Sequence, residues 1–264
     1  MSASAAPRIA ARASRAFGAS EASGVAALFV DECVRDVQGV ALPGPEVQLV
    51  VRFGPNTQTG LDVHAMGCRE SVHRKLLRRG QRIVGARLQL GAAEAVLGVP
   101  ASAITGRIVA LEDLWGSVTT RRLFDRFADA RDTFEAAGIL ESVIAERFAL
   151  SGGQRAHTHL VLDAANRLAS ASVNAVAVAL GLSERHLRRV FRETTGVSPK
   201  AFAKLTRFRR AVRAARAEKH EGWATIAASA GYYDQAHLIS EFRAIAGVTP
   251  RVFLGELGAA QAIG

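Results

Sequence analysis

The sequence of 264 residues predicts an α+β protein with a β-rich N-terminal part and an all-α C-terminal part. Three observations lead to this fold class. Short segments rich in β-branched residues occur in the first third of the chain, helical patterns fill the remainder, and one helical pattern occurs twice near the C-terminus. A chain of this length is expected to form one or two domains, and we divide it into two.

Several short segments between residues 24 and 90 have the composition of β-strands. Residues 25–37 have a strand or mixed pattern, and the clearer strand candidates are 47–54, 61–67, 73–77 and 82–90. The first of these four ends at Gly54-Pro55, a typical start of a turn. Short strands separated by glycine-rich turns indicate a small β-barrel or β-sandwich.

Helical patterns begin at residue 92 with a short helix over 92–98. Residues 118–149 then predict a pair of helices, for which we expect the break at Gly138. Apolar residues such as Leu123 and Phe127 share one face of the first helix, whereas Arg and Asp alternate on the other. The apolar faces could pack on the β-domain or form a dimer interface, and the sequence leaves both open.

Residues 173–202 predict a helix, a tight turn and a second, arginine-rich helix from about Ser183 to Thr194. Gly181 suits the left-handed conformation that ends many helices. The hydroxyl of Ser183 is a suitable N-cap for the second helix. This helix buries a Leu-Val-Phe stripe and exposes several arginines, as a helix that reads a DNA major groove does. On its own, the pattern also fits a solvated basic face on an ordinary helical hairpin.

The same pattern recurs in residues 223–253. Six landmarks of the first copy return in the same order, and their spacing from the leucine onward is identical. The pairs are Gly181 and Gly231, Leu187 and Leu238, Phe191 and Phe242, Gly196 and Gly247, Pro199 and Pro250, and Phe202 and Phe253. The second copy has one extra residue after its first glycine, so that Asp234 takes the capping position of Ser183. Two such units could read two stretches of one DNA duplex.

The charge distribution supports this interpretation. The chain has a net charge of +10, and residues 154–264 contain 16 Lys and Arg but only 8 Asp and Glu. Residues 1–153 contain 18 Lys and Arg and 16 Asp and Glu, so that most of the excess positive charge lies around the repeats. Such a basic region is typical of nucleic-acid binding, in which cations displace the counterions of phosphates.

Three motifs resemble the DNA-binding domain of the AraC/XylS family of transcription regulators. They are A-x-x-L-G-L-S-x-R-x-L-R-R-x-F at 177–191, G-V-S-P-K-A-F at 196–202 and G-Y-Y-D-Q-A-H-L-x-x-x-F at 231–242. The resemblance covers about 154–254. It implies two helix-turn-helix units joined by a linker helix from Pro199 to about Ala217, with the two recognition helices in successive major grooves. It also implies a cupin-like, ligand-binding N-terminal domain.

The resemblance places the DNA contacts on the outward faces of the two recognition helices. The candidate DNA-binding residues are Arg185, Arg188, Arg189 and Arg192 in the first unit, and Gln235, Ala236, His237 and Ser240 in the second. Arginine can bond guanine through two nitrogens, glutamine can pair with adenine, and alanine can contact the thymine methyl group. Any of the arginines could instead contact only phosphate, and Arg192 is the best candidate for that role.

These features give a full domain assignment. We expect a disordered leader over 1–23, an N-terminal regulatory or dimerisation domain with its helical pair over 24–150, a linker over 151–158, the DNA-binding domain over 159–254 and a frayed tail over 255–264. The expected partner is double-stranded promoter or operator DNA. RNA polymerase, a small-molecule effector and a second copy of the chain are further candidates.

Other classes of protein find less support. No nucleotide-binding loop or nucleophile elbow occurs, and the N-terminal part lacks the H-x-H plus Glu signature of metal-binding cupins, so that we expect no metal, cofactor or catalytic residue. Two distant cysteines, Cys33 and Cys68, favour a reducing cytoplasm, although a disulfide between them stays open. No apolar run is long enough to span a membrane. A ligand-independent architectural DNA-binding protein, or an enzyme with an unrecognised N-terminal site, remains as an alternative.

Overall fold

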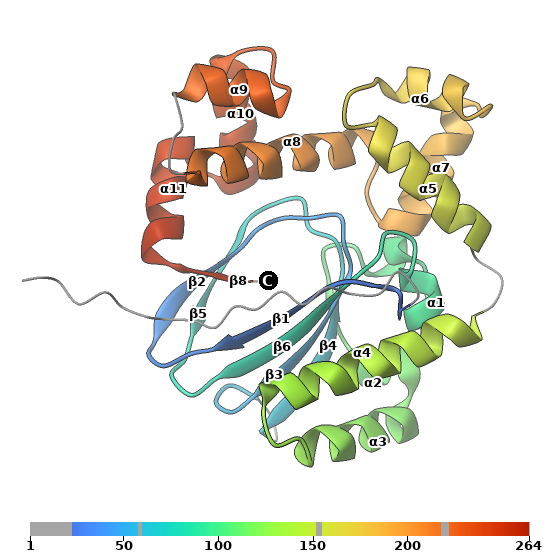
Figure 1. The fold of residues 1–264 in the computed structure, drawn as a ribbon, viewed down its shortest axis with the longest axis vertical. Coiled ribbons are helices and arrows are strands. Elements are labelled where there is room, and N and C mark those ends of the chain that lie inside the picture. The colour runs from blue at the N-terminus through green and yellow to red at the C-terminus, as the bar shows by residue number, and fades with distance from the viewer. Residues whose placement is uncertain (1–22, 58–59, 152–154, 218–221, 264) are drawn as a thin grey trace, which may run out of the picture.

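The computed structural model describes residues 23–57, 60–151, 155–217 and 222–263. The expected leader over 1–23 therefore lies almost entirely outside the described residues. The chain forms a β-rich N-terminal part followed by helices, as the sequence predicts (Figure 1). Among the described residues, no helix has both the length and the apolar character that crossing a membrane demands.

Within the part of the chain that the structure describes, the N-terminal part has two β-sheets. The larger sheet has the order β1-β6-β3-β4-β7, and the smaller sheet has the order β5-β2-β8. The strands are β1 (Val25–Glu32), β2 (Val37–Ala41), β3 (Gln48–Phe53), β4 (Leu61–Met66), β5 (His73–Leu77), β6 (Arg82–Leu88), β7 (Ile108–Ala110) and β8 (Gln261–Ile263). The four clearest strand predictions are confirmed as β3 to β6.

Each face of the larger sheet packs against a core, and alternate residues of a strand point to opposite faces. On β3, Leu49 and Val51 belong to a core shared with the helices of the N-terminal part. Val50 faces the other way and packs with Phe29 and Leu77 in a core between the two sheets. Both cysteines are free and buried, so that no disulfide joins Cys33 to Cys68.

The helical extension packs on the outer face of the larger sheet (Figure 1). It comprises α1 (Ala93–Leu97), the 3-10 helix η2 (Ala101–Ile104), α2 (Leu111–Trp115), α3 (Ser117–Ala128) and α4 (Thr133–Leu150). Leu140, Val143 and Ile144 of α4 are buried in the core that includes β1 and β6. Of the two alternatives for the helical pair, the structure therefore supports packing on the β-domain.

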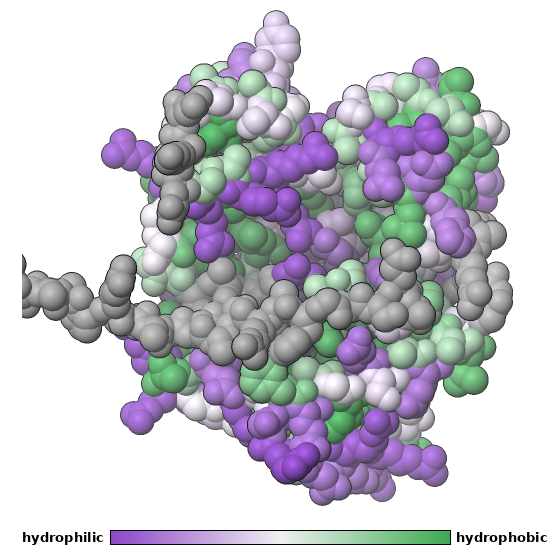
Figure 2. Space-filling model, viewed as in Figure 1, coloured by the Kyte–Doolittle hydropathy of each residue, from purple (hydrophilic) through white to green (hydrophobic). Residues whose placement is uncertain are grey.

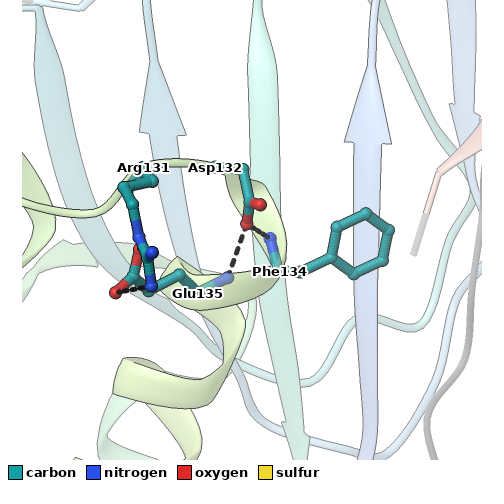
Figure 3. A network of polar contacts seen from close by, with 4 residues as sticks. All are labelled: Arg131, Asp132, Phe134 and Glu135. Atoms are coloured by element: carbon teal, nitrogen blue, oxygen red, sulfur yellow. Dashed lines mark hydrogen bonds and ion pairs between the residues drawn. The ribbon is translucent and has the colours of Figure 1, made fainter.

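The expected helix break at Gly138 is wrong, since α4 runs through this residue. The break lies at Asp132, whose carboxylate accepts hydrogen bonds from the backbone N–H groups of Phe134 (2.9 Å) and Glu135 (2.8 Å) (Figure 3). Glu135 in turn accepts from the backbone N–H of Arg131 at 2.8 Å. A capping side chain satisfies free N–H groups, whereas one glycine inside a helix costs only about 1 kcal/mol. The cap therefore determines the boundary.

The described residues of the C-terminal part form seven helices. They are α5 (Arg155–Arg167), α6 (Val173–Ala179), α7 (Glu184–Thr195), α8 (Pro199–Arg216), α9 (Trp223–Ala230), α10 (Gln235–Ala246) and α11 (Pro250–Ala259). The expected linker over 151–158 falls partly outside the described residues, and its last residues belong to α5. The long helix α8 connects two compact lobes, one containing α6 and α7 and the other α9 and α10 (Figure 1).

The expected frayed tail over 255–264 is wrong for the described residues. Helix α11 continues to Ala259, with Leu257 buried, and β8 then pairs in parallel with β2. Residues 261–263 therefore add a strand to the smaller sheet of the N-terminal part.

The two parts of the chain share cores and polar contacts. Cys68 packs in the core of the first helical lobe, and Val40 packs in the core of the second. The backbone N–H of Val72 donates to the carbonyl oxygen of Ile245 at 2.9 Å. Both helical lobes are therefore docked on the N-terminal part.

Candidate nucleic-acid interface

The first helical unit is built by local signals in its sequence. The Ser172 hydroxyl caps α6, and the Ser183 hydroxyl caps α7 by accepting from the backbone N–H of His186 at 3.2 Å. Between the two helices, Gly181 has the left-handed φ of 67° that a tight turn requires. Leu187 and its neighbours on the same face of α7 are buried, as predicted. The sequence thus determines which face of α7 is exposed.

All four arginines predicted on α7 are exposed. Arg188 pairs with Glu184, and Arg189 pairs with Glu193 at 3.1 Å, both one turn apart on the helix. Arg185 and Arg192 form no ion pair with another described residue. Exposed pairs of this kind contribute only about 0.3–0.5 kcal/mol, so that they leave the guanidinium groups free to exchange partners.

The second unit repeats this geometry. Gly231 has a φ of 88°, and the Asp234 carboxylate caps α10 by accepting from the backbone N–H of His237 at 2.7 Å. Leu238 and Phe242 are fully buried beneath the helix. The four residues predicted on this unit are all exposed, namely Gln235, Ala236, His237 and Ser240.

One of these four residues also takes part in a polar network behind the helix. His237 Nε2 lies 3.5 Å from the carboxylate of Glu241, and the same carboxylate oxygen accepts from Arg207 of α8 at 2.7 Å. The imidazole also packs edge-on against the Tyr232 ring, with 5.4 Å between centroids. His237 is therefore partly held by the protein, unlike Gln235 beside it.

Tyr233 is an exposed aromatic residue that the sequence reasoning did not single out. It lies in the turn before α10 and is 93% exposed. The signal was available, because the second unit has one extra residue at this turn and that residue is a tyrosine. A tyrosine hydroxyl at this place can donate a hydrogen bond to phosphate.

The linker helix α8 fixes the two units relative to each other. Phe202 packs in the core of the first unit, whereas Phe208 and Val212 pack in the core of the second. Three arginines of α8 have partners elsewhere in the protein instead of being only solvated. Arg207 pairs with Glu241, Arg209 pairs with Glu46, and Arg210 donates a hydrogen bond to the Ala169 carbonyl oxygen. Hydrophilic residues nevertheless gather along the visible side of α8 (Figure 2).

The first unit is also attached to the N-terminal part at the end of α7. The hydroxyl of Thr105 donates to the carbonyl oxygen of Gly196 at 3.0 Å. A Cβ atom added to Gly196 would lie 2.5 Å from the Cys68 sulfur. This close approach, together with a φ of 82°, requires glycine at the position.

A family model of the helix-turn-helix domain matches residues 176–256. The match begins inside α6 and ends inside α11, so that it spans both units and the helix between them. Residues 176–256 form an AraC-type helix-turn-helix domain. The AraC-type domain is thus the segment in which the repeat, the two left-handed glycine turns and the exposed helix faces occur.

No curated protein matches this chain significantly. Among solved structures, the chain is similar to ToxT from Vibrio cholerae strain SCE256 bound to an unsaturated fatty acid, with a TM-score of 0.45, 9% identity, and coverage of 89% of this chain and 96% of that one. It is also similar to ToxT from Vibrio cholerae O395, with a TM-score of 0.42, 10% identity, and coverage of 87% and 96%. The AraC-like transcriptional activator CuxR has a TM-score of 0.21, 12% identity, and coverage of 73% and 74%.

Proposed function

We propose that this chain is a sequence-specific transcription regulator whose helices α7 and α10 enter successive major grooves of one DNA duplex. The observation that carries the proposal is the pair of helix-turn-helix units on one continuous helix, each with an exposed polar face. Helix α8 has 18 residues and is therefore about 27 Å long. Successive major grooves on one side of DNA are roughly 34 Å apart, so that units at the two ends of such a helix can reach both.

In the first groove, we assign base contacts to Arg185, Arg188 and Arg189, and a phosphate contact to Arg192. A two-nitrogen contact of arginine with guanine discriminates by about 1–3 kcal/mol. This exceeds the contribution of the exposed ion pairs that Arg188 and Arg189 form within α7. At the correct DNA sequence, it is therefore favourable for Arg188 and Arg189 to leave their glutamate partners and bind guanine.

In the second groove, Gln235 is assigned to adenine and Ala236 to a thymine methyl group, with His237 and Ser240 beside them. The exposed face of α10 is much less basic than that of α7, which supports a smaller contribution to affinity and a greater dependence on DNA shape. Tyr233, at the turn before α10, is added as a phosphate contact.

The N-terminal part would sense an effector, mediate dimerisation or do both, and RNA polymerase would be a further partner. A cavity between the two sheets favours effector sensing. The competing proposal, an architectural DNA-binding protein without an effector, requires that no small molecule changes the affinity for the operator. Titration of the DNA complex with small molecules distinguishes the two.

The test is a footprint and gel-shift on the promoter nearest the protein's own gene. We expect two protected stretches about one helical turn apart. Arg189→Ala should weaken specific binding by roughly 5- to 150-fold, which corresponds to about 1–3 kcal/mol, with little effect on non-specific binding. Arg121→Ala, an exposed arginine on α3, is the matched control and should bind as the wild type does. Unchanged sequence preference in Arg189→Ala would contradict the proposal.

A further inference from the structure

A cavity of about 60 Å³ lies between the two sheets. Its apolar wall comes mainly from the larger sheet and includes Phe29, Val50 and Ile83. A region that holds one water needs about 10–15 Å³, so that the cavity has room for about four to six waters or for a small polar group with a short apolar chain.

The polar lining of the cavity is mostly basic. Arg52 comes from β3, Arg69 follows β4, and Lys75 comes from β5, which also contributes the imidazole of His73. These positive charges come from three different segments, and only the fold brings them to one place. The carboxylate that lines the cavity, Glu46, already pairs with Arg209 of α8.

These cations lack partners among the described residues. The buried Nε of Arg52 has no hydrogen-bond partner there, and neither Arg69 nor Lys75 forms a side-chain ion pair with a described residue. Burial lowers the pKa of Arg52 and that of Lys75, and the opposite effects of Asp62 on Arg52 and of Asp31 on Lys75 are smaller. Burying a charge without a partner is costly, and several like charges in one cavity increase that cost.

The protonation of Lys75 reflects this environment. Burial, followed by repulsion from Arg52 and Arg69, lowers the pKa of Lys75 to about 8. Burial also lowers the pKa of His73, with the neighbouring cations adding to the effect. An anion in the cavity would oppose both shifts, since it would pair with the charged groups and offset their mutual repulsion.

We propose that this cavity binds the oxyanion group of a small molecule, a carboxylate or a phosphate, between Arg52, Arg69 and Lys75. The two arginines can each offer a planar fork of N–H donors that matches an oxyanion, and Lys75 adds a compact charge. Phe29, Val50 and Ile83 would contact the short apolar part of the same ligand. The proposal deepens the effector role proposed above and rests on it only for the effect on DNA binding.

The site is also next to a contact between the two parts of the chain. Glu46 lines the cavity and holds Arg209, which is on the helix that joins the two DNA-binding units. A ligand charge placed beside Glu46 acts directly on this ion pair. The cavity is therefore positioned to affect how α8 is held against the N-terminal part.

The experiment uses the full-length protein, with butyrate and inorganic phosphate as anionic probes and butyramide as the neutral control. The chain has four lysines, so that ¹³C-dimethylated lysines give four resolvable NMR signals. We expect the titration midpoint of Lys75 to lie near pH 8 in the free protein and to rise by about one unit with a bound anion. Butyramide should leave it unchanged.

Two variants locate the site. Arg52→Gln should weaken anion binding, measured by calorimetry, by at least tenfold, whereas Arg79→Gln removes an exposed arginine of the same domain and should have no effect. Lys75→Met gives a second test that does not depend on the folding of Arg52→Gln. Circular dichroism and thermal unfolding check that each variant is folded.

The two probes distinguish the sources of the anion. Binding of butyrate alone identifies a carboxylate, binding of phosphate alone identifies a phosphate, and binding of both identifies a general oxyanion site. If neither anion moves the Lys75 signal, or if Arg52→Gln binds both as the wild type does, the proposal is wrong. None of these readouts uses DNA, so that failure here is separate from failure of the proposed DNA-binding function.

Discussion

The two glycines that end helices α7 and α10 provide a matched test of how the two parts of the chain are docked. Gly196 ends α7 with a φ of 82°, and Gly247 ends α10 with a φ of 77°. Alanine at either position has to adopt a left-handed conformation, which costs roughly 1–2 kcal/mol. A Cβ atom at Gly247 would meet no atom within 4 Å, whereas one at Gly196 would lie 2.5 Å from Cys68 Sγ and 2.7 Å from Thr105 Oγ1.

This difference sets the expected magnitudes. Gly247→Ala should lower the free energy of unfolding by roughly 1–2 kcal/mol. Gly196→Ala should lower it by the same amount plus roughly 1–3 kcal/mol for overpacking against the N-terminal part, or about 2–5 kcal/mol in total. Urea unfolding followed by circular dichroism measures both. Equal losses in the two variants would refute the docking of α7 against Cys68 and Thr105.

Two further predictions concern the N-terminal part. Lys75 has a pKa of about 8 in the folded state and the ordinary value of 10.5 in the unfolded state, so that the unfolded state binds more protons between about pH 8 and 10.5. The charged Lys75 therefore destabilises the folded state fully below pH 8, and this destabilisation fades as the pH rises. Lys75→Met should therefore be more stable than the wild type at pH 7, with the difference shrinking towards pH 10 in denaturant melts; a constant difference would contradict this sign. Arg74 donates to Glu256 at 2.7 Å and to the Ala246 carbonyl oxygen at 2.9 Å, so that Arg74→Ala should lower the free energy of unfolding by about 1 kcal/mol, while the exposed control Arg78→Ala changes it by a few tenths at most.

The features that the sequence predicted well are local. Ser183 and Asp234 cap their helices because a capping oxygen needs only the N–H groups two or three residues ahead. Gly181 and Gly231 mark turns because their backbone geometry is left-handed. The repeat made these short signals decisive, since it showed each of them twice. The exposed faces of α7 and α10 followed directly from their buried faces.

The features that the sequence missed depend on distant partners. Nothing near β8 indicates that it pairs with β2, more than 200 residues earlier. The ion pairs of Arg207 with Glu241 and of Arg209 with Glu46 likewise join separate segments. The positive charge of the segment in the sequence therefore did not reveal that these arginines connect separate parts of the protein.

The basic cavity illustrates the same limit. Arg52, Arg69 and Lys75 lie on different segments and share no spacing that a motif search would detect. The break before α4 was missed for another reason, because the sequence offered both a glycine at 138 and a capping aspartate at 132. The aspartate determined the boundary through two hydrogen bonds, and the glycine was accommodated within the helix.

In the proposed function, one rigid helix, α8, holds the two units at a distance that matches two successive major grooves. The most direct measurement is the affinity of the wild type for operators in which five or ten base pairs are inserted between the two protected stretches. A rigid α8 of about 27 Å cannot follow either change, so that both insertions should reduce affinity to that of a single unit on DNA. Full affinity for either operator would contradict the claim.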